Sequence, residues 1–126
     1  MRILFIGDVV GRTGREAVGA ALPQLRAQLR IDLAVVNAEN ASHGFGLGPD
    51  MAAALFAAGA DVITLGNHAW DRKEIIPFIA DHPRLIRPLN YPPGTPGAGA
   101  IVVEVPAGST PGAGAVRRVL VMQARS

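Results

Sequence analysis

The chain of 126 residues contains no cysteine and few aromatic side chains, which make up 5% of it. Without thiols it can form neither a disulfide nor a thiolate metal site, which suits a reducing compartment. No apolar stretch is long enough to cross a membrane, and Asp8 interrupts the first one, Ile3–Ile6, too early for a secretory leader. We therefore expect a cytoplasmic protein with no membrane partner.

An excess of charge of one sign is also lacking. The net charge is only +2, and the arginines are scattered along the chain. A nucleic-acid-binding surface needs a concentrated basic patch, so we expect no DNA partner. The hydrophobic content of 49% in a chain of this length is enough for one buried core. We predict a single domain over residues 1–126.

Short apolar runs that alternate with helix-like segments predict an α/β fold with a parallel β-α-β core. The expected parallel strands are Arg2–Ile6, Leu33–Val36 and Val62–Leu65. Two later apolar runs, joined by a connection rich in proline and glycine, predict an antiparallel hairpin. Its expected strands are Ala100–Val105 and Arg117–Met122.

Capping and breaking residues indicate where the first two helices begin and end. Thr13 and Glu16 fit a capping box at the start of the first helix, and Pro23 should kink or divide that helix. Pro49 fits the first turn of the second helix, and Gly59 should end it.

The third helix and the segment after it are less regular. Asp71 and Glu74 suggest a helix start, so we interpret Asp71 as a cap rather than a ligand. Pro77 should disturb this short helix. Residues 87–97, rich in proline and glycine, predict a loop of fixed conformation.

Polar side chains follow each of the three expected parallel strands. Asp8 follows the first, Glu39 and Asn40 the second, and Asn67 and His68 the third, where Gly66 lets the backbone turn. Right-handed crossovers bring the carboxyl ends of parallel strands to one edge, so we expect these side chains to converge. Two nearby carboxylates repel each other unless a cation lies between them. Oxygen donors with some imidazole suit Mn²⁺, Fe or Mg²⁺, and the sequence therefore predicts a metal site.

Each of these residues also has an ordinary structural interpretation. Asp8 could cap a turn, and the asparagines could satisfy loop backbone. Glu39 could be solvated, and His68 could bond a carbonyl group. The metal interpretation is favoured because the ordinary ones must all hold at three strand ends together. Of the other histidines, we expect His43 at the mouth of the site and His82 in a surface turn.

A second kind of site is conceivable where residues 7–14 open the first helix. Free N–H groups at a helix start suit a phosphate, and Arg12 or Arg15 could assist. The glycine spacing does not fit a dinucleotide motif, and a P-loop lysine is missing. Ordinary solvated arginines are the favoured interpretation. The alternative is a flavodoxin-like domain that binds a phosphate or nucleotide without catalysis.

Four segments of the chain carry a resemblance: Gly7–Gly11, Asn37–Asn40, Gly66–Asp71 and Arg87–Gly97. Together they resemble the calcineurin-like metallophosphoesterases and, more closely, their YmdB-like bacterial branch, which hydrolyses cyclic nucleotides. The general superfamily has a histidine where Val10 stands and an acid where Ala69 stands. Both departures are normal for the YmdB-like branch.

The resemblance implies a role for each candidate residue. Asp8 would hold one metal, Glu39 would bridge or share two, and Asn40 and Asn67 would complete the pair from this chain. His68 matches the catalytic histidine, which stabilises phosphoryl oxygens or protonates the leaving oxygen. The implied cofactors are two divalent or mixed-valence metal ions, Fe or Mn first and Mg or Zn as alternatives. They would activate a hydroxide against small phosphodiesters, with 2',3'-cyclic nucleotides favoured.

The same resemblance implies that residues 1–126 are the N-terminal portion of a longer enzyme, about half of a four-layer α/β/β/α sandwich. The family's remaining metal-binding histidines lie in the C-terminal half, and this chain has only three histidines. An inactive half-site or a regulatory module is the alternative. Without the second sheet an apolar face should stay uncovered, which predicts a homo-oligomer.

Overall fold

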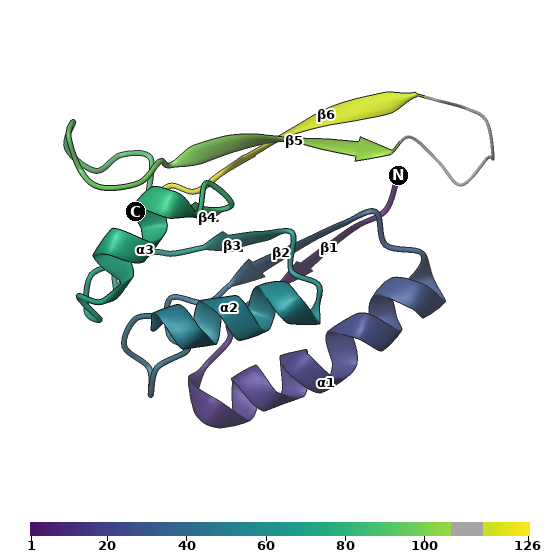
Figure 1. Ribbon diagram of the computed structural model, residues 1–126, viewed down its shortest axis with the longest axis horizontal. Helices are drawn as coiled ribbons and strands as arrows, with labels where there is room; N and C mark the ends of the chain where they lie inside the picture. The colour runs from purple at the N-terminus through teal and green to yellow at the C-terminus, as the bar shows by residue number, and fades with distance from the viewer. Residues whose placement is uncertain (107–114) are drawn as a thin grey trace.

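The computed structural model describes residues 1–106 and 115–126. Its centre is a parallel sheet of four strands in the order β1-β2-β3-β4 (Figure 1). The strands are β1 (Ile3–Ile6), β2 (Leu33–Asn37), β3 (Val62–Thr64) and β4 (Leu85–Ile86). The three expected parallel strands are confirmed, each shifted by one residue at one end.

The fourth strand, β4, was not predicted. It consists of two residues, and Ile63 of β3 pairs with Leu85 while Thr64 pairs with Ile86. Two residues are too few for an alternating pattern to be recognised in a sequence. The strand exists because both of its side chains are buried in the surrounding core.

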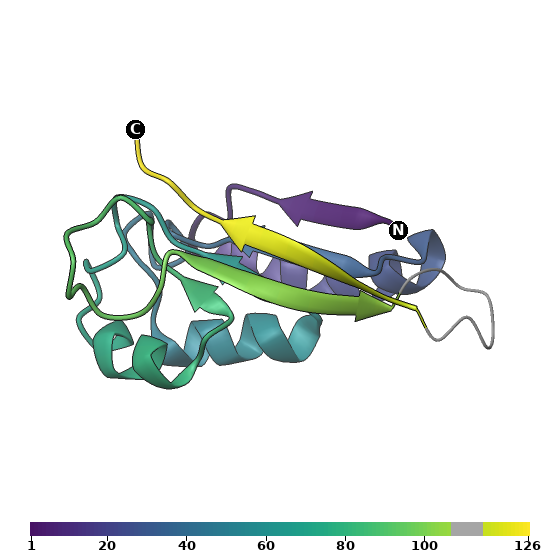
Figure 2. The ribbon, with the colours of Figure 1, turned by 90° about the horizontal axis from the view of Figure 1, so that it is seen from above.

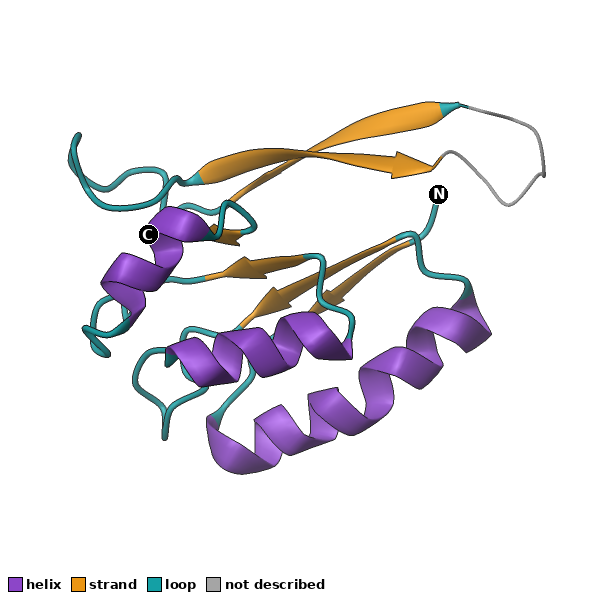
Figure 3. Cartoon of the chain, viewed as in Figure 1, coloured by secondary structure: helices purple, strands orange, loops and turns teal. Residues whose placement is uncertain are grey.

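Each strand lies beside the one that precedes it in the chain, so every crossover steps in the same direction. Right-handed crossovers then place all the helices on one face of the sheet. The other face is covered by an antiparallel hairpin of β5 (Ala100–Pro106) and β6 (Val116–Met122), as Figure 3 shows. The hairpin is confirmed, and its connection lies largely outside the described residues. A flavodoxin-like sheet has helices on both faces, so that alternative is not the architecture found here.

The first helix, α1 (Gly11–Leu29), begins earlier than expected. Val10 precedes it without a side-chain cap, and Glu16 accepts a hydrogen bond from Arg12 at 2.7 Å instead of capping the helix. The capping box predicted at Thr13 is therefore wrong. Of the two outcomes predicted for Pro23, a kink or a division of the helix, the division is wrong, because α1 runs unbroken past the proline, which is exposed to solvent.

The second helix, α2 (Pro49–Ala58), has the ends that the sequence predicts. Proline occupies its first position, and Gly59 adopts the left-handed conformation with φ of 119° at its end. The third helix, α3 (Ile75–Asp81), begins later than expected. Glu74 directly precedes it, so the interpretation of Asp71 as its cap is wrong.

Two hydrophobic clusters lie on the two faces of the parallel sheet. On the helix face, Val36 and Ile63 pack with Leu22 of α1 and Leu55 of α2. On the hairpin face, the residues between sheet and hairpin are Leu33, Val35, Val62, Ile86, Val103 and Val105. All five residues of β2 are buried, as expected for a strand covered on both faces. The burial holds the strand ends, and the loops that follow them, in a fixed position.

The hairpin leaves part of the apolar surface uncovered. Figure 2 shows that it runs over the sheet while β1 lies beside it. Ile3 and Phe5 of β1 are 52% and 62% exposed, and Leu120 and Met122 of β6 also face solvent. These positions agree with the expected uncovered apolar face, and association through that face stays a prediction. Among the described residues, no helix is long and apolar enough to cross a membrane.

Candidate metal centre

The loops after β1 and β2 are hydrogen-bonded to each other at the carboxyl edge of the sheet. The backbone N–H of Val9 donates to the carbonyl of Asn37 at 3.1 Å, and that of Gly11 donates to the carbonyl of Asn40 at 3.0 Å. The side-chain amide of Asn40 then donates to the Asp8 carboxylate, with Nδ2 2.7 Å from Oδ2. Two of the predicted ligands, from different strand ends, are therefore in direct contact.

Glu39, the third predicted ligand, lies against Gly66 at the end of β3. A Cβ atom placed on Gly66 would come within 2.1 Å of Glu39 Oε2. The turn at the strand end already favours glycine at this position, but the close approach of the carboxylate is the stronger requirement. Only glycine leaves room for the carboxylate of Glu39 beside the segment that carries Asn67.

The buried carboxylate oxygen of Glu39 has no hydrogen-bond partner within the described residues. Leaving a buried charged oxygen unpaired is costly, and a cation would remove the cost. Oxygen donors from Asp8, Glu39, Asn40 and Asn67 suit a hard or borderline metal ion. The residues present therefore fit a metal. The described residues bring together no group of three or more His, Cys, Asp or Glu side chains, so they supply only part of a ligand set.

His68 is held by a carboxylate from its own loop. Its Nδ1 lies 2.7 Å from Oδ2 of Asp71, and both side chains are partly exposed, at 30% and 38%. The Phe45 ring meets the imidazole edge-on, with centroids 5.6 Å apart. If Nδ1 is protonated and donates a hydrogen bond to Asp71, Nε2 is the ring nitrogen that is left to interact with a ligand. Neither partner was predicted, although the three-residue spacing of histidine and aspartate was a signal.

The loop between β2 and α2 packs against the segment that carries Asp71. Arg72 donates from Nη1 to the hydroxyl of Ser42 at 2.8 Å. Gly46 approaches so closely that a Cβ atom there would lie 3.1 Å from the backbone nitrogen of Arg72. His43, in the same loop, is exposed, and its position at the mouth of the site stays a prediction. These contacts fix the position of Asp71 relative to the loop after β2, which carries two of the predicted ligands.

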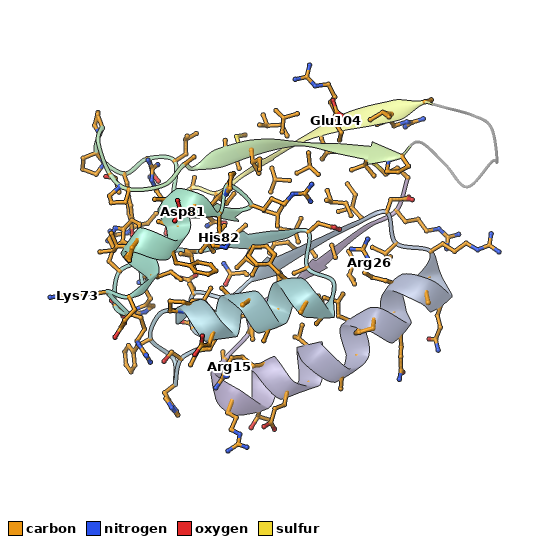
Figure 4. The ribbon with its side chains drawn as sticks, in the orientation of Figure 1. Arg15, Arg26, Lys73, Asp81, His82 and Glu104 are labelled. Atoms are coloured by element: carbon orange, nitrogen blue, oxygen red, sulfur yellow. The ribbon has the colours of Figure 1, made fainter. Side chains whose placement is uncertain are left out.

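The two arginines considered for a phosphate site at the start of α1 have other partners. Arg15, labelled on α1 in Figure 4, donates to the carbonyl of Ala41 at 3.0 Å. Arg12 pairs with Glu16, and this hydrogen bond raises the pKa of the Arg12 guanidinium. Both arginines thus serve local structure, and the phosphate-binding alternative gains no support.

The segment 87–97 is fixed by a buried arginine whose role the sequence did not reveal. Arg87 donates to the carbonyls of Pro88, Thr95, Pro96 and Gly97 over 3.0–3.3 Å. A charged donor that satisfies four carbonyls explains the fixed loop that the sequence predicts. The loop presents Tyr91, whose hydroxyl donates to the carbonyl of Gly66 at 3.0 Å.

His82 does not take part in the candidate site. It ends α3, where its ring stacks on Phe78 with centroids 3.6 Å apart and Nδ1 lies 2.7 Å from the Phe78 carbonyl oxygen. The Leu85 N–H donates to the carbonyl of His82 at 2.9 Å, so His82 opens the turn before β4, and the turn that the sequence predicts is present although the residue is only partly exposed. A cavity of about 540 Å³ next to it is lined by Phe56 and Arg84 among others and contains none of the predicted site residues.

The sheet, the strand-end carboxylates and the Gly66-Asn67-His68 turn define a protein of the calcineurin-like metallophosphoesterase superfamily. A family described as YmdB-like protein matches residues 4–124, so this chain belongs to the YmdB-like family. The recognition made from the sequence is thereby confirmed.

Three relatives illustrate the similarity. The 2',3'-cyclic-nucleotide 2'-phosphodiesterase of Bacillus subtilis (strain 168) is 51% identical over 104 residues, which are 82% of this chain and 39% of the relative. A hypothetical protein from Thermus thermophilus has a crystal structure that matches with a TM-score of 0.83 and 44% identity, over 98% of this chain and 44% of that one. A novel phosphatase from Mycoplasma pneumoniae matches with a TM-score of 0.74 and 38% identity, over 81% and 38%. The chain spans less than half the length of each.

Proposed function

We propose that residues 1–126 fold as a single domain and form the N-terminal portion of a metal-dependent phosphodiesterase, with 2',3'-cyclic nucleotides as favoured substrates. The observation that carries the proposal is the unpartnered, buried Glu39 Oε2 beside Gly66, within the part of the chain that the structure describes. It gives the strand-end edge an uncompensated negative charge in the neighbourhood of His68. The name of the Bacillus subtilis relative supports the substrate class.

The metal ligands from this chain would be Asp8, Glu39, Asn40 and Asn67, and they would hold two ions. Fe or Mn is favoured, with Mg or Zn as alternatives, because the donors are oxygen atoms. When bound, such ions supply a nucleophile from water at neutral pH and positive charge beside the phosphoryl group. The remaining ligands would come from the C-terminal portion of the protein.

The side chains of this chain have separate tasks in the proposed reaction. As an imidazolium, His68 donates a hydrogen bond from Nδ1–H to Asp71 and delivers its second proton, held at Nε2, to the leaving oxygen of the phosphodiester. Asn40 orients the Asp8 carboxylate through its amide N–H. Phe45 packs against the imidazole and limits its rotation.

Two further properties belong to the same proposal. The exposed apolar side chains Ile3 and Phe5 on β1 and Leu120 and Met122 on β6 support association into a homo-oligomer. The absence of cysteine supports a cytoplasmic location. An inactive half-site is the alternative to an active enzyme.

The test is Mn²⁺ binding to the full-length protein under anaerobic conditions, together with hydrolysis of a 2',3'-cyclic nucleotide. Glu39→Ala should abolish Mn²⁺ binding at the site and, as a consequence, hydrolysis of the cyclic nucleotide. Glu104→Ala, on the solvent side of β5, is the matched control and should leave both at wild-type level. Metal binding without hydrolysis in the wild type would support the inactive half-site. Equal binding in Glu39→Ala would refute the site.

A further inference from the structure

A pocket of about 430 Å³ opens beside the candidate metal centre. Asn67 and Asp71 form part of its wall, so it is continuous with the predicted ligand set and with the carboxylate that holds His68. Its remaining wall includes Trp70, Tyr91 and Arg125, which the proposed reaction does not use. A substrate whose phosphoryl group lies at the metal centre would extend another part of itself into this space.

The aromatic wall of the pocket is held in place by the backbone of the site. The rings of Trp70 and Tyr91 are tilted by 42° with centroids 6.2 Å apart. The Tyr91 hydroxyl donates to the carbonyl of Gly66, which directly precedes Asn67. The aromatic surface is therefore fixed relative to a predicted metal ligand. Aromatic surfaces of this kind bind planar heterocycles by stacking.

The backbone of the arginine in the wall, Arg125, is also held by the fold. Asn90 clamps the backbone of Arg125 by donating from Nδ2 to its carbonyl at 2.6 Å and accepting from its N–H at 2.9 Å. The clamp connects the loop after β4 to the segment after β6. It brings Arg125 into the same wall as Asp71.

The charges of the pocket select the kind of occupant. A second phosphate would be attracted by Arg125 but repelled by Asp71, because both residues line the same space. An uncharged planar group with both donors and acceptors suits this pair of charges better, since each charge can form a hydrogen bond to it. Nucleobases have these properties.

We infer that this pocket binds the base of a nucleotide substrate, with Trp70 as the stacking surface and Arg125 as a hydrogen-bond donor. The inference rests on the proposed phosphodiesterase function. It makes Trp70 and Arg125 residues that determine which phosphodiesters are preferred. The metal centre would act on the phosphoryl group, and the pocket would recognise the nucleoside.

The experiment compares two substrates of the metal-loaded full-length protein. One is adenosine 2',3'-cyclic phosphate, and the other is 1-O-methylribose 2',3'-cyclic phosphate, which has the same reacting group but no base. The measured quantity is kcat/KM for the adenosine substrate divided by kcat/KM for the substrate without a base. Trp70→Leu should lower this ratio about tenfold, because base stacking is lost. Trp70→Phe keeps an aromatic face and should retain most of the ratio. Phe56→Leu on α2, outside the pocket, is the control and should not change it.

An unchanged ratio in Trp70→Leu would overturn the inference while leaving the phosphodiesterase intact. If that variant does not fold, Arg125→Gln at an exposed position replaces it, and the ratio should fall several-fold. If the wild type cleaves neither substrate, the proposed function fails and the pocket is tested separately. Adenosine should then still quench the emission of Trp70, which is identified as the fluorescence lost in Trp70→Phe. The absence of quenching would refute binding of the base in this pocket as well.

Discussion

The imidazole Nδ1 of His68 and the carboxylate Oδ2 of Asp71 lie 2.7 Å apart in one short turn after β3. This contact determines which ring nitrogen is left for a substrate. Asp71 is itself held in place by the loop between β2 and α2, because Arg72, the next residue, bonds Ser42. The orientation of the histidine therefore depends on the packing of two strand-end loops.

Asp71→Asn should lower kcat for a cyclic nucleotide by about 10- to 100-fold, because an amide can hold the wrong tautomer of the imidazole. Metal content should stay at the wild-type level. Steady-state kinetics and metal analysis on the full-length protein check this. His68→Ala should lower kcat at least as far and also retain metal. Full activity in either variant would exclude the proposed proton transfer by His68.

Gly66→Ala should weaken metal binding by about 10- to 100-fold, since the added methyl group displaces the Glu39 carboxylate. Calorimetric titration with Mn²⁺ measures the effect. Gly19→Ala on the exposed side of α1 is the matched control, because nothing lies within 4 Å of the added Cβ atom. It should leave metal affinity unchanged and stabilise the helix by about 0.5–1 kcal/mol. Wild-type affinity in Gly66→Ala would contradict the placement of Glu39.

Removal of metal should destabilise the wild-type protein, whereas it should leave the stability of the Glu39→Gln variant unchanged. A ligand that binds only the folded state at about 100 times its Kd adds about 2.7 kcal/mol to the free energy of unfolding. Thermal melts with and without a chelator test this. The wild type should lose several degrees in Tm, whereas the Glu39→Gln melt should be indifferent to the chelator. A chelator effect of equal size in both proteins would mean that the metal binds elsewhere.

Arg87→Met should lower the free energy of unfolding by about 2–3 kcal/mol, because four carbonyl groups lose a charged donor. Denaturant titration measures it. Arg84→Met, three residues earlier, is the control: Arg84 is exposed and lies 4.0 Å from Asp61, so the change should stay within about 0.5 kcal/mol. Equal effects would mean that the loop after β4 does not depend on Arg87.

The positions of the predicted metal ligands can be read from local sequence patterns. The side chains and carbonyl groups that bond to residues around the site cannot be read in this way. Asp8, Glu39 and Asn67 could be found because each follows an apolar run that forms a buried strand. The pairing of His68 with Asp71 was missed because aspartate near a helix start is more often a cap. Arg87 was missed because a buried arginine bonded only to carbonyls leaves no charge pattern in the sequence. Strand β4 was missed because tertiary burial, and not its two-residue pattern, makes it a strand.

The order of the strands in the sheet has a consequence for how the site is assembled. Ile3 pairs with Leu33, Val35 with Val62, and Ile63 with Leu85, so each strand joins only the one made just before it. Short separations of this kind favour rapid pairing. The sheet can therefore grow in the order of synthesis, and β2 and β3 each bring their predicted ligands to an edge that has already begun to form.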